Sequence, residues 1–261
     1  MRFPAPIVKN TVNQTLSKVP EVTLIFWVIK VAATTLGETG GDAVSMSMNL
    51  GYLEATAIFA AIFAVAVIAQ IRARAFHPFL YWTTIIATTT VGTTLADFAD
   101  RSLGIGYAGG TSLLFALLMA SLAVWYKSLS SVSVDTVSSP KAEMFYWITI
   151  MFSQTLGTAL GDFLSDSSGL GFKGGAFLIG GLLSLVVLAY YLTPLNRVFL
   201  FWVAFVLTRP FGATFGDLLT KPTQKGGLNL GTAGSSAVLA AILIGFVIYT
   251  SRTVKQPTPE W

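Results

Sequence analysis

Four aspartates recur in the chain at a fixed distance from a tryptophan and a glycine. The pattern Trp-x9-Gly-x4-Asp occurs four times without a gap, and its copies end at Asp42, Asp97, Asp162 and Asp217. Carboxylate oxygens bind hard cations and exchange protons, and carboxylates that share one site cannot all stay ionised without compensation. The chemistry that these residues predict is therefore the handling of a cation or a proton.

The first and fourth copies carry further ionisable residues. Glu38 and Asp42 are four residues apart, so both carboxylates lie on one face of a helix and repel each other unless a cation or proton lies between them. Lys30 and Arg209 lie inside apolar runs, where ionisable residues are functional candidates. We predict that they are structural counter-ions that compensate the charge of the aspartates, and the alternative is that they snorkel to the interface. The predicted ion-binding residues, which are also the candidate metal ligands, are Glu38, Asp42, Asp97, Asp162 and Asp217.

Long apolar segments must position these residues. The chain has 261 residues, of which 54% are hydrophobic and only 11% charged, and its mean hydropathy is +0.71. Runs of about 20 apolar residues are long enough to cross a bilayer as helices. The predicted fold class is an all-α integral membrane protein with eight transmembrane helices, at residues 21–42, 51–71, 79–99, 109–127, 143–164, 174–192, 197–218 and 231–250.

The eight helices form four repeats of two helices each. Successive motif tryptophans, from Trp27 to Trp202, are 55, 65 and 55 residues apart, which places the extra length between the second and third copies. Because each repeat has an even number of spans, all copies share one orientation and are parallel repeats. The predicted divisions are a cytoplasmic N-terminal segment at 1–20, a first membrane half at 21–127, a cytoplasmic linker at 128–142, a second membrane half at 143–250 and a cytoplasmic tail at 251–261.

Small residues in the motif predict close helix packing. In each copy a glycine is followed four residues later by a second small residue, on the same helix face, which lets two backbones approach. The motif tryptophans lie near the start of their helices, where tryptophan commonly anchors at the membrane interface. The glycines assigned to packing are Gly37, Gly41, Gly92, Gly157, Gly161, Gly212 and Gly216.

The distribution of basic residues predicts the topology. Ten lysines and arginines fall at one set of loops and at both termini, against four in the other set of loops. By the positive-inside rule both termini are cytoplasmic, in a multi-pass protein of the plasma (inner) membrane. This bias explains the net charge of +4 without nucleic acid as a partner. Asp100, Arg101 and Asp166, which follow their motifs, are interpreted as solvated loop charges.

Several kinds of site are excluded or disfavoured. The chain has no cysteine and a single histidine, so thiolate sites are excluded and a histidine-rich metal site is disfavoured. No nucleophile–base pair or nucleotide motif is present, so we expect no enzyme. The sequence points to no firm cofactor, and a bound cation is the one candidate. Lipid and a small cation are the expected partners, together with a second copy of the chain in a homo-oligomer.

The fourfold motif resembles a bacterial family of uncharacterised multi-spanning proteins built from a membrane-anchored repeat of unknown function. The resemblance covers residues 21–250 and implies a fold pattern without a settled activity. A fainter resemblance links the first copy to the Glu-x-Gly-Asp-Lys/Arg motif of calcium and manganese exchangers, although here an extra residue precedes the aspartate and Ala43 replaces the basic residue. The segment concerned is Gly37-Glu38-Thr39-Gly40-Gly41-Asp42.

Three functions are compatible with the sequence. The leading hypothesis is a transporter that exports or exchanges a cation, including a divalent metal, in a proton-coupled way. The first alternative is a cation channel in which the aspartates form a ring. The second is a non-transporting membrane scaffold, in which the motif aspartates only mark helix ends. The unequal copies favour an asymmetric transport site over a symmetric pore.

Overall fold

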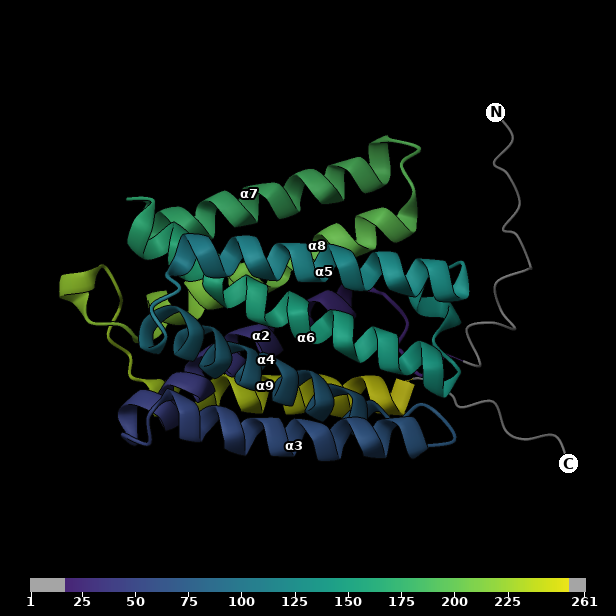
Figure 1. The fold of residues 1–261 in the computed structure, drawn as a ribbon, viewed down its shortest axis with the longest axis horizontal. Coiled ribbons are helices and arrows are strands. Elements are labelled where there is room, and N and C mark those ends of the chain that lie inside the picture. Colours follow the sequence, from purple (N-terminus) through teal and green to yellow (C-terminus); the bar gives the residue numbers. More distant parts are fainter. Residues whose placement is uncertain (1–16, 254–261) are drawn as a thin grey trace, which may run out of the picture.

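The computed structural model describes residues 17–253, so most of the predicted terminal segments 1–20 and 251–261 lies outside the described residues. The described part is helical and contains no strand (Figure 1). Its long helices match the eight predicted ones closely in number and position. They are α2 (Leu24–Asp42), α3 (Tyr52–Arg72), α4 (Pro78–Asp97), α5 (Tyr107–Leu129), α6 (Pro140–Asp162), α7 (Gly171–Leu192), α8 (Arg197–Thr220) and α9 (Thr232–Thr253).

Local sequence signals explain where several helices begin. The side chains of Thr23 and Ser139 accept hydrogen bonds from the first-turn amides of α2 and α6. Pro140 follows Ser139 as the first residue of α6, where its missing N–H costs nothing. Gly51 and Gly106 precede α3 and α5 with φ values of 85° and 73°, a left-handed conformation that glycine adopts without strain.

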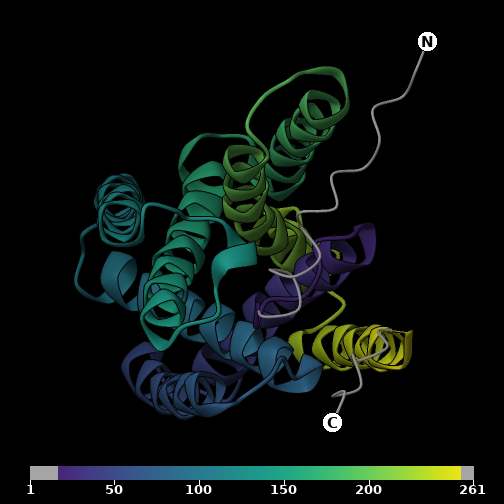
Figure 2. The same cartoon turned by 90° about the vertical axis from the view of Figure 1, so that its right-hand side faces the viewer.

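The four motif helices α2, α4, α6 and α8 form a closed ring. Each contacts two others, in the order α2, α4, α6, α8 and back to α2. The remaining helices stand outside: α3 packs on α4, α5 on α6, α7 on α8, and α9 completes the pattern by packing on α2. The end-on view in Figure 2 shows this arrangement of inner and outer helices. Each outer helix therefore covers the motif helix of the next repeat, not that of its own.

The motif glycines make the inner helices approach closely, with the same contact in all four seams of the ring. Each glycine faces the residue that lies seven positions after the tryptophan on the neighbouring helix. A Cβ added to Gly92, for example, would lie 3.0 Å from the backbone nitrogen of Thr155 and 3.1 Å from the Cβ of Gln154. The pairs in contact are Gly37 with Thr89, Gly92 with Gln154, Gly157 with Arg209 and Gly212 with Thr34.

The second small residue repeats this contact one turn later. Gly41 faces Thr93, Gly161 faces Ala213 and Gly216 faces Glu38. In these three seams both layers of contacts advance together along the two helices, so these neighbours run parallel. The predicted role of the motif glycines in helix packing agrees with these contacts.

Gly37 and Gly40 provide a matched test of this packing on a single helix. A Cβ at position 37 would collide with the buried side chain of Thr89, whereas a Cβ at position 40 would meet nothing within 4 Å. We expect Gly37→Ala to lower the free energy of unfolding by about 1–3 kcal/mol through overpacking. Gly40→Ala should leave that free energy unchanged or raise it by up to about 1 kcal/mol, because alanine favours the helix. Denaturing-detergent titrations would measure both, and equal effects would contradict the packing role.

Aromatic side chains fill the ring at the end where the inner helices begin, which we call the aromatic end. Trp82, Trp147 and Trp202 are at most 5% exposed and belong to the hydrophobic core. Their predicted role as anchors at the membrane interface is therefore wrong, because the neighbouring helices enclose them. The hydroxyls of Tyr81 and Tyr146 lie 2.6 Å apart in a hydrogen bond between α4 and α6.

The segment between α5 and α6 packs against the aromatic end. Val134 and Val137 are buried in the core, and the carbonyl of Val132 accepts a 2.9 Å hydrogen bond from the indole of Trp202. Lys18 forms a 2.6 Å ion pair with Glu143, in the first turn of α6. The region predicted as a polar linker is therefore not detached from the bundle.

Five helices are long and apolar enough to cross a membrane: α3, α5, α7, α8 and residues Thr232–Arg252 of α9. In the four outer helices only 11–17% of the apolar window is buried, so long apolar faces are left exposed. Exposed apolar surface on this scale indicates a membrane-embedded protein. In α8, which belongs to the inner ring, 56% of the window is buried.

Candidate cation-binding site

The structure brings all five predicted acidic residues together at the end of the ring where the inner helices finish, which we call the acidic end. Glu38 and the four motif aspartates are each at most 3% exposed. Carboxylate oxygens of Glu38, Asp162 and Asp217 all lie within 4.8 Å of one another. These three residues come from three different helices, α2, α6 and α8, so only the closed ring places them together.

Two basic side chains link the motif aspartates in pairs. Arg101 lies 3.1 Å from both Asp97 and Asp162, which joins α4 to α6. Lys221 lies 2.6 Å from Asp42 and 3.2 Å from Asp217, which joins α2 to α8. The Arg101 and Lys221 side chains are 27% and 19% exposed, so they cover the buried aspartates on the outer side of the acidic end.

Both covering residues are strongly basic in this setting. Burial lowers the pKa of Lys221, but the carboxylates of Asp217 and Asp42 outweigh burial and raise that pKa above its ordinary value. Burial also lowers the pKa of Arg101, but the carboxylates of Asp97 and Asp162 outweigh burial and raise that pKa above its ordinary value. Both side chains therefore carry a positive charge at neutral pH.

Arg209 is the third basic side chain that contacts the acidic cluster. Its side chain is fully buried, and one guanidinium nitrogen donates a 2.9 Å hydrogen bond to Glu38. The same nitrogen donates to the hydroxyl of Thr93 at 2.6 Å and to the hydroxyl of Thr158. Arg209 thus reaches from α8 to α2, α4 and α6, which places the guanidinium across the axis of the ring. Its predicted role as a charge-compensating residue agrees with these contacts.

Lys30 does not compensate the acidic cluster. Its ammonium is fully buried and lies 4.2 Å from the ring centre of Phe205, on the face of α8 one turn before Arg209. Among residues 17–253 this ammonium has no hydrogen-bond partner and no carboxylate within 4.0 Å. The prediction that Lys30 balances the aspartates is therefore wrong, because its side chain ends beside an aromatic ring.

The interpretation of Asp100 as a solvated loop charge is also wrong, and the same interpretation of Arg101, which is partly exposed, misses its two ion pairs. Asp100 is 6% exposed, and Arg101 holds two aspartates of the cluster. Burial raises the pKa of Asp100 to about 6, against the lowering effect of Arg101. Asp166, in contrast, accepts a 3.3 Å hydrogen bond from Tyr107 in an exposed position. After α2, α4 and α6 the chain continues in short π-helical turns past the motif aspartate, and the turn after α4 keeps Arg101 against the cluster.

The sequence carried a signal for the two covering bases. Four residues after the motif aspartate, the four copies have Met46, Arg101, Asp166 and Lys221. A base therefore stands at this position in the second and fourth copies only. Residues four apart share a helix face, so each base is placed to reach the aspartate of its own copy. Its second aspartate lies on a neighbouring helix of the ring, and only the structure identifies that partner.

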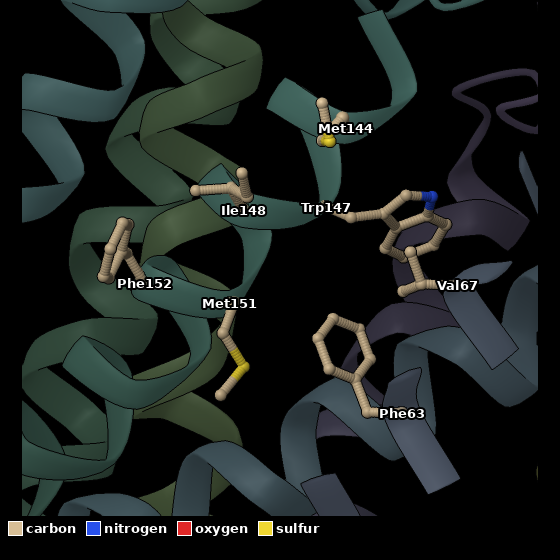
Figure 3. Close-up of a pocket in the computed structure, with 7 residues that line it drawn as sticks. All are labelled: Phe63, Val67, Met144, Trp147, Ile148, Met151 and Phe152. Carbon is tan, nitrogen blue, oxygen red and sulfur yellow. The ribbon is translucent and has the colours of Figure 1, made fainter. Parts of the chain in front are cut away.

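An apolar pocket of about 260 Å³ lies between α3 and α6, away from the acidic end (Figure 3). Its lining comprises Phe63, Val67, Met144, Trp147, Ile148, Met151 and Phe152. None of these side chains is a ligand for a hard cation, which requires oxygen. We therefore place the candidate site at the acidic cluster.

Comparison with known proteins supports the repeat and leaves the activity open. A family model matches the chain four times, at residues 25–76, 80–130, 145–195 and 200–256. Each match contains one inner helix and the outer helix that follows it in the sequence. No curated protein and no solved structure matches the chain. Four matches that together cover most of its length show that the chain belongs to the family described as Repeat of Unknown Function (DUF347).

Proposed function

We propose that the chain is a multi-spanning membrane transporter that exchanges protons for a small, hard cation at the acidic end. The observation that carries this proposal is the convergence of three buried carboxylates, Glu38, Asp162 and Asp217, within 4.8 Å. At that separation two like charges repel by about 3 kcal/mol for an effective dielectric constant of about 20. A cation bound between the oxygens removes this repulsion, and so does a proton on one carboxylate.

The charge balance of the cluster supports the same proposal. Five carboxylates face three basic side chains, Arg101, Lys221 and Arg209. With every group ionised, the formal charge of the cluster is 3 − 5 = −2. One divalent cation, or two protons, would bring this formal charge to zero. The two occupants are therefore alternatives at one site, which is the requirement for exchange.

The proposal includes eight membrane spans with both termini in the cytoplasm of a bacterial inner membrane. Helices α2, α4 and α6 are 19 to 23 residues long, which is sufficient for a span. Their polar side chains face one another inside the ring, and the apolar outer helices surround them. Such shielding allows a polar helix to cross a bilayer. The excess of basic residues at the aromatic end favours that end as the cytoplasmic one.

A cation channel is the second candidate, because a closed ring of parallel helices that ends in four aspartates suits a pore. Two observations favour the carrier. The guanidinium of Arg209 lies across the axis of the ring, where its positive charge opposes cation passage. Buried tryptophans also fill the aromatic end. A carrier binds its ion in a closed conformation of this kind and then rearranges.

The first test is whether a cation stabilises the folded protein. A ligand of the folded state raises the apparent stability by mass action. We expect thermal unfolding in detergent to shift upward with one or more members of a series of Na⁺, K⁺, Mg²⁺, Ca²⁺, Mn²⁺ and Zn²⁺, and the shift to shrink as the pH falls. Flux of the stabilising cation into proteoliposomes should then depend on the pH gradient. Conduction without any coupling ion would instead identify a channel.

Glu38→Gln provides the matched test of the site, with Glu54→Gln as its control. Glu38 is one of the converging carboxylates, whereas Glu54 is exposed in the first turn of α3. Both substitutions remove one negative charge and leave the shape of the side chain nearly unchanged. We expect Glu38→Gln to abolish cation-dependent stabilisation and flux, and Glu54→Gln to retain both. If no cation stabilises or crosses with the wild-type protein, the scaffold function replaces the proposal.

A further inference from the structure

Each of the three converging carboxylates holds a different basic side chain. Glu38 is 2.9 Å from Arg209, Asp162 is 3.1 Å from Arg101, and Asp217 is 3.2 Å from Lys221. These bases occupy the oxygens on which a cation would depend. A cation and an ammonium or guanidinium repel each other, so they compete for the same carboxylate.

Asp42 and Asp97 stand in a different position within the cluster. Neither belongs to the converging group, yet each contacts a base that also contacts a converging aspartate. Lys221 is closer to Asp42, at 2.6 Å, than to Asp217. Arg101 is 3.1 Å from Asp97, as it is from Asp162. Each covering base therefore already contacts a second carboxylate, Asp42 for Lys221 and Asp97 for Arg101, and can stay bound to it after leaving the converging aspartate.

We propose that the four motif aspartates have two different roles. Asp162 and Asp217, together with Glu38, ligate the cation, whereas Asp42 and Asp97 hold Lys221 and Arg101 when the cation displaces these bases. This division of roles rests on the proposed cation exchange and specifies how the site is regulated. Lys221 and Arg101 thus compete with the cation for Asp217 and Asp162, and they pair with these carboxylates when no cation is bound.

Free acceptor capacity supports this division. Among the described residues, Asp42 Oδ1 is buried and accepts no hydrogen bond, while Lys221 pairs with Oδ2 of the same carboxylate. The second oxygen of Asp42 therefore provides room for Lys221 once it is displaced. Asp97 already holds Arg101, with its Oδ1 3.1 Å from the guanidinium Nε. In the converging group, Asp217 Oδ1 lies 3.2 Å from the Lys221 ammonium and accepts no other hydrogen bond. When Lys221 moves to Asp42, Asp217 Oδ1 becomes a buried acceptor without a partner, and a bound cation would satisfy it.

Arg209 needs no third holding carboxylate. Its guanidinium donates to the hydroxyls of Thr93 and Thr158 as well as to Glu38. When the Glu38 carboxylate binds a cation instead of Arg209, these hydroxyls still accept hydrogen bonds from the guanidinium. The three bases thus retain polar partners in both states, which keeps the cost of displacing them low.

Two charge-matched double variants test the division. Asp42→Asn with Lys221→Gln removes a holding carboxylate and its base, whereas Asp217→Asn with Lys221→Gln removes a ligand and the same base. Both keep the formal charge of the cluster at its wild-type value. Apparent affinities for Mg²⁺, Ca²⁺ and Mn²⁺, each added as the metal alone, would come from thermal unfolding in detergent. The unfolding curve without metal shows whether each variant is folded.

We expect the Asp42→Asn/Lys221→Gln variant to bind within about threefold of the wild type, and the Asp217→Asn/Lys221→Gln variant about 100-fold more weakly, because ligand number sets affinity for hard cations. Asp42→Asn alone should bind about tenfold more weakly, since Lys221 then remains on Asp217. Equal losses in the two double variants would overturn the proposed division. A wild-type protein that binds no metal would instead refute the cation site itself.

The second pair of aspartates gives an independent repetition. Arg101→Gln combined with Asp97→Asn removes the other holding carboxylate, and Arg101→Gln combined with Asp162→Asn removes the other ligand. We expect the same contrast in affinity. If the Asp97 combination loses binding as completely as the Asp162 combination, Asp97 is a ligand and the proposed division is wrong. This pair remains informative if a substitution at Asp217 prevents folding.

Discussion

Arg209→Met is expected to lower the free energy of unfolding by about 3–5 kcal/mol, because it leaves the buried carboxylate of Glu38 without its cation. Arg209 is fully buried, and Glu38 is only 3% exposed, so water cannot replace the lost ion pair. Methionine fills a similar space without strain and carries no charge. The loss of stability therefore reports the uncompensated acid. Denaturing-detergent titrations of wild type and variant would measure it.

A second substitution separates this electrostatic effect from lost packing. With Glu38→Gln added, no uncompensated carboxylate remains, and we expect the double variant to recover to within about 1–2 kcal/mol of the wild type. If the double variant is as unstable as Arg209→Met alone, the loss comes from packing around Gly157, which the Arg209 side chain contacts. The role of Arg209 as the counter-ion of Glu38 would then be contradicted.

The repeat made most of the fold predictable from the sequence. A pattern that recurs four times with a fixed internal spacing fixes the positions of the inner helices, and a glycine that contacts the same neighbouring position in every seam fixes how they pack. The position of all four motif aspartates at one end of the ring follows from those two features. Because the contacts repeat from seam to seam, one motif is sufficient to anticipate the ring.

The charged residues outside the motif could not be predicted in the same way. Arg101 and Lys221 lie beyond the motif aspartates, where a helix that simply ended would release them into water. The chain instead continues as a π-helical turn at Arg101, and this turn keeps the base against the cluster. The second partner of each base lies on another helix, so the pairing depends on the order of helices around the ring.

The tryptophans were assigned to the wrong environment for a related reason. A tryptophan at the start of an apolar helix is consistent with a membrane interface, but Trp82, Trp147 and Trp202 are buried. The sequence reports where a residue lies along its helix more directly than which face of the helix it occupies. Here the neighbouring helices and the segment after α5 cover that face. These three tryptophans thus fill the interior of the ring at the aromatic end.

Lys30→Met is expected to raise the free energy of unfolding, by about 2 kcal/mol or more. A buried charge costs several kcal/mol, and the interaction of the Lys30 ammonium with Phe205, at 4.2 Å, offsets about 2 kcal/mol of that cost at most. Methionine has a similar length and is well suited to the apolar surroundings. Denaturing-detergent titrations would give the difference from the wild type.

Lys18→Met is the control, because we expect it to change the free energy of unfolding in the opposite direction. Lys18 is also buried, but it forms a 2.6 Å ion pair with Glu143 and donates hydrogen bonds to the carbonyls of Gln70 and Ile71. Its removal leaves Glu143 uncompensated, so we expect lower stability. If Lys30→Met instead lowers stability as Lys18→Met does, the Lys30 ammonium has a partner in the folded protein, and its burial beside Phe205 is not a net cost.

A residue that weakens the fold is retained where function requires it, since stability and activity often conflict at functional sites. The Lys30 ammonium lies beside Phe205, which is one turn before Arg209 on the neighbouring helix α8. We therefore expect Lys30→Met to be more stable and slower in cation flux than the wild type. A variant that gained stability and kept full flux would show that Lys30 takes no part in transport.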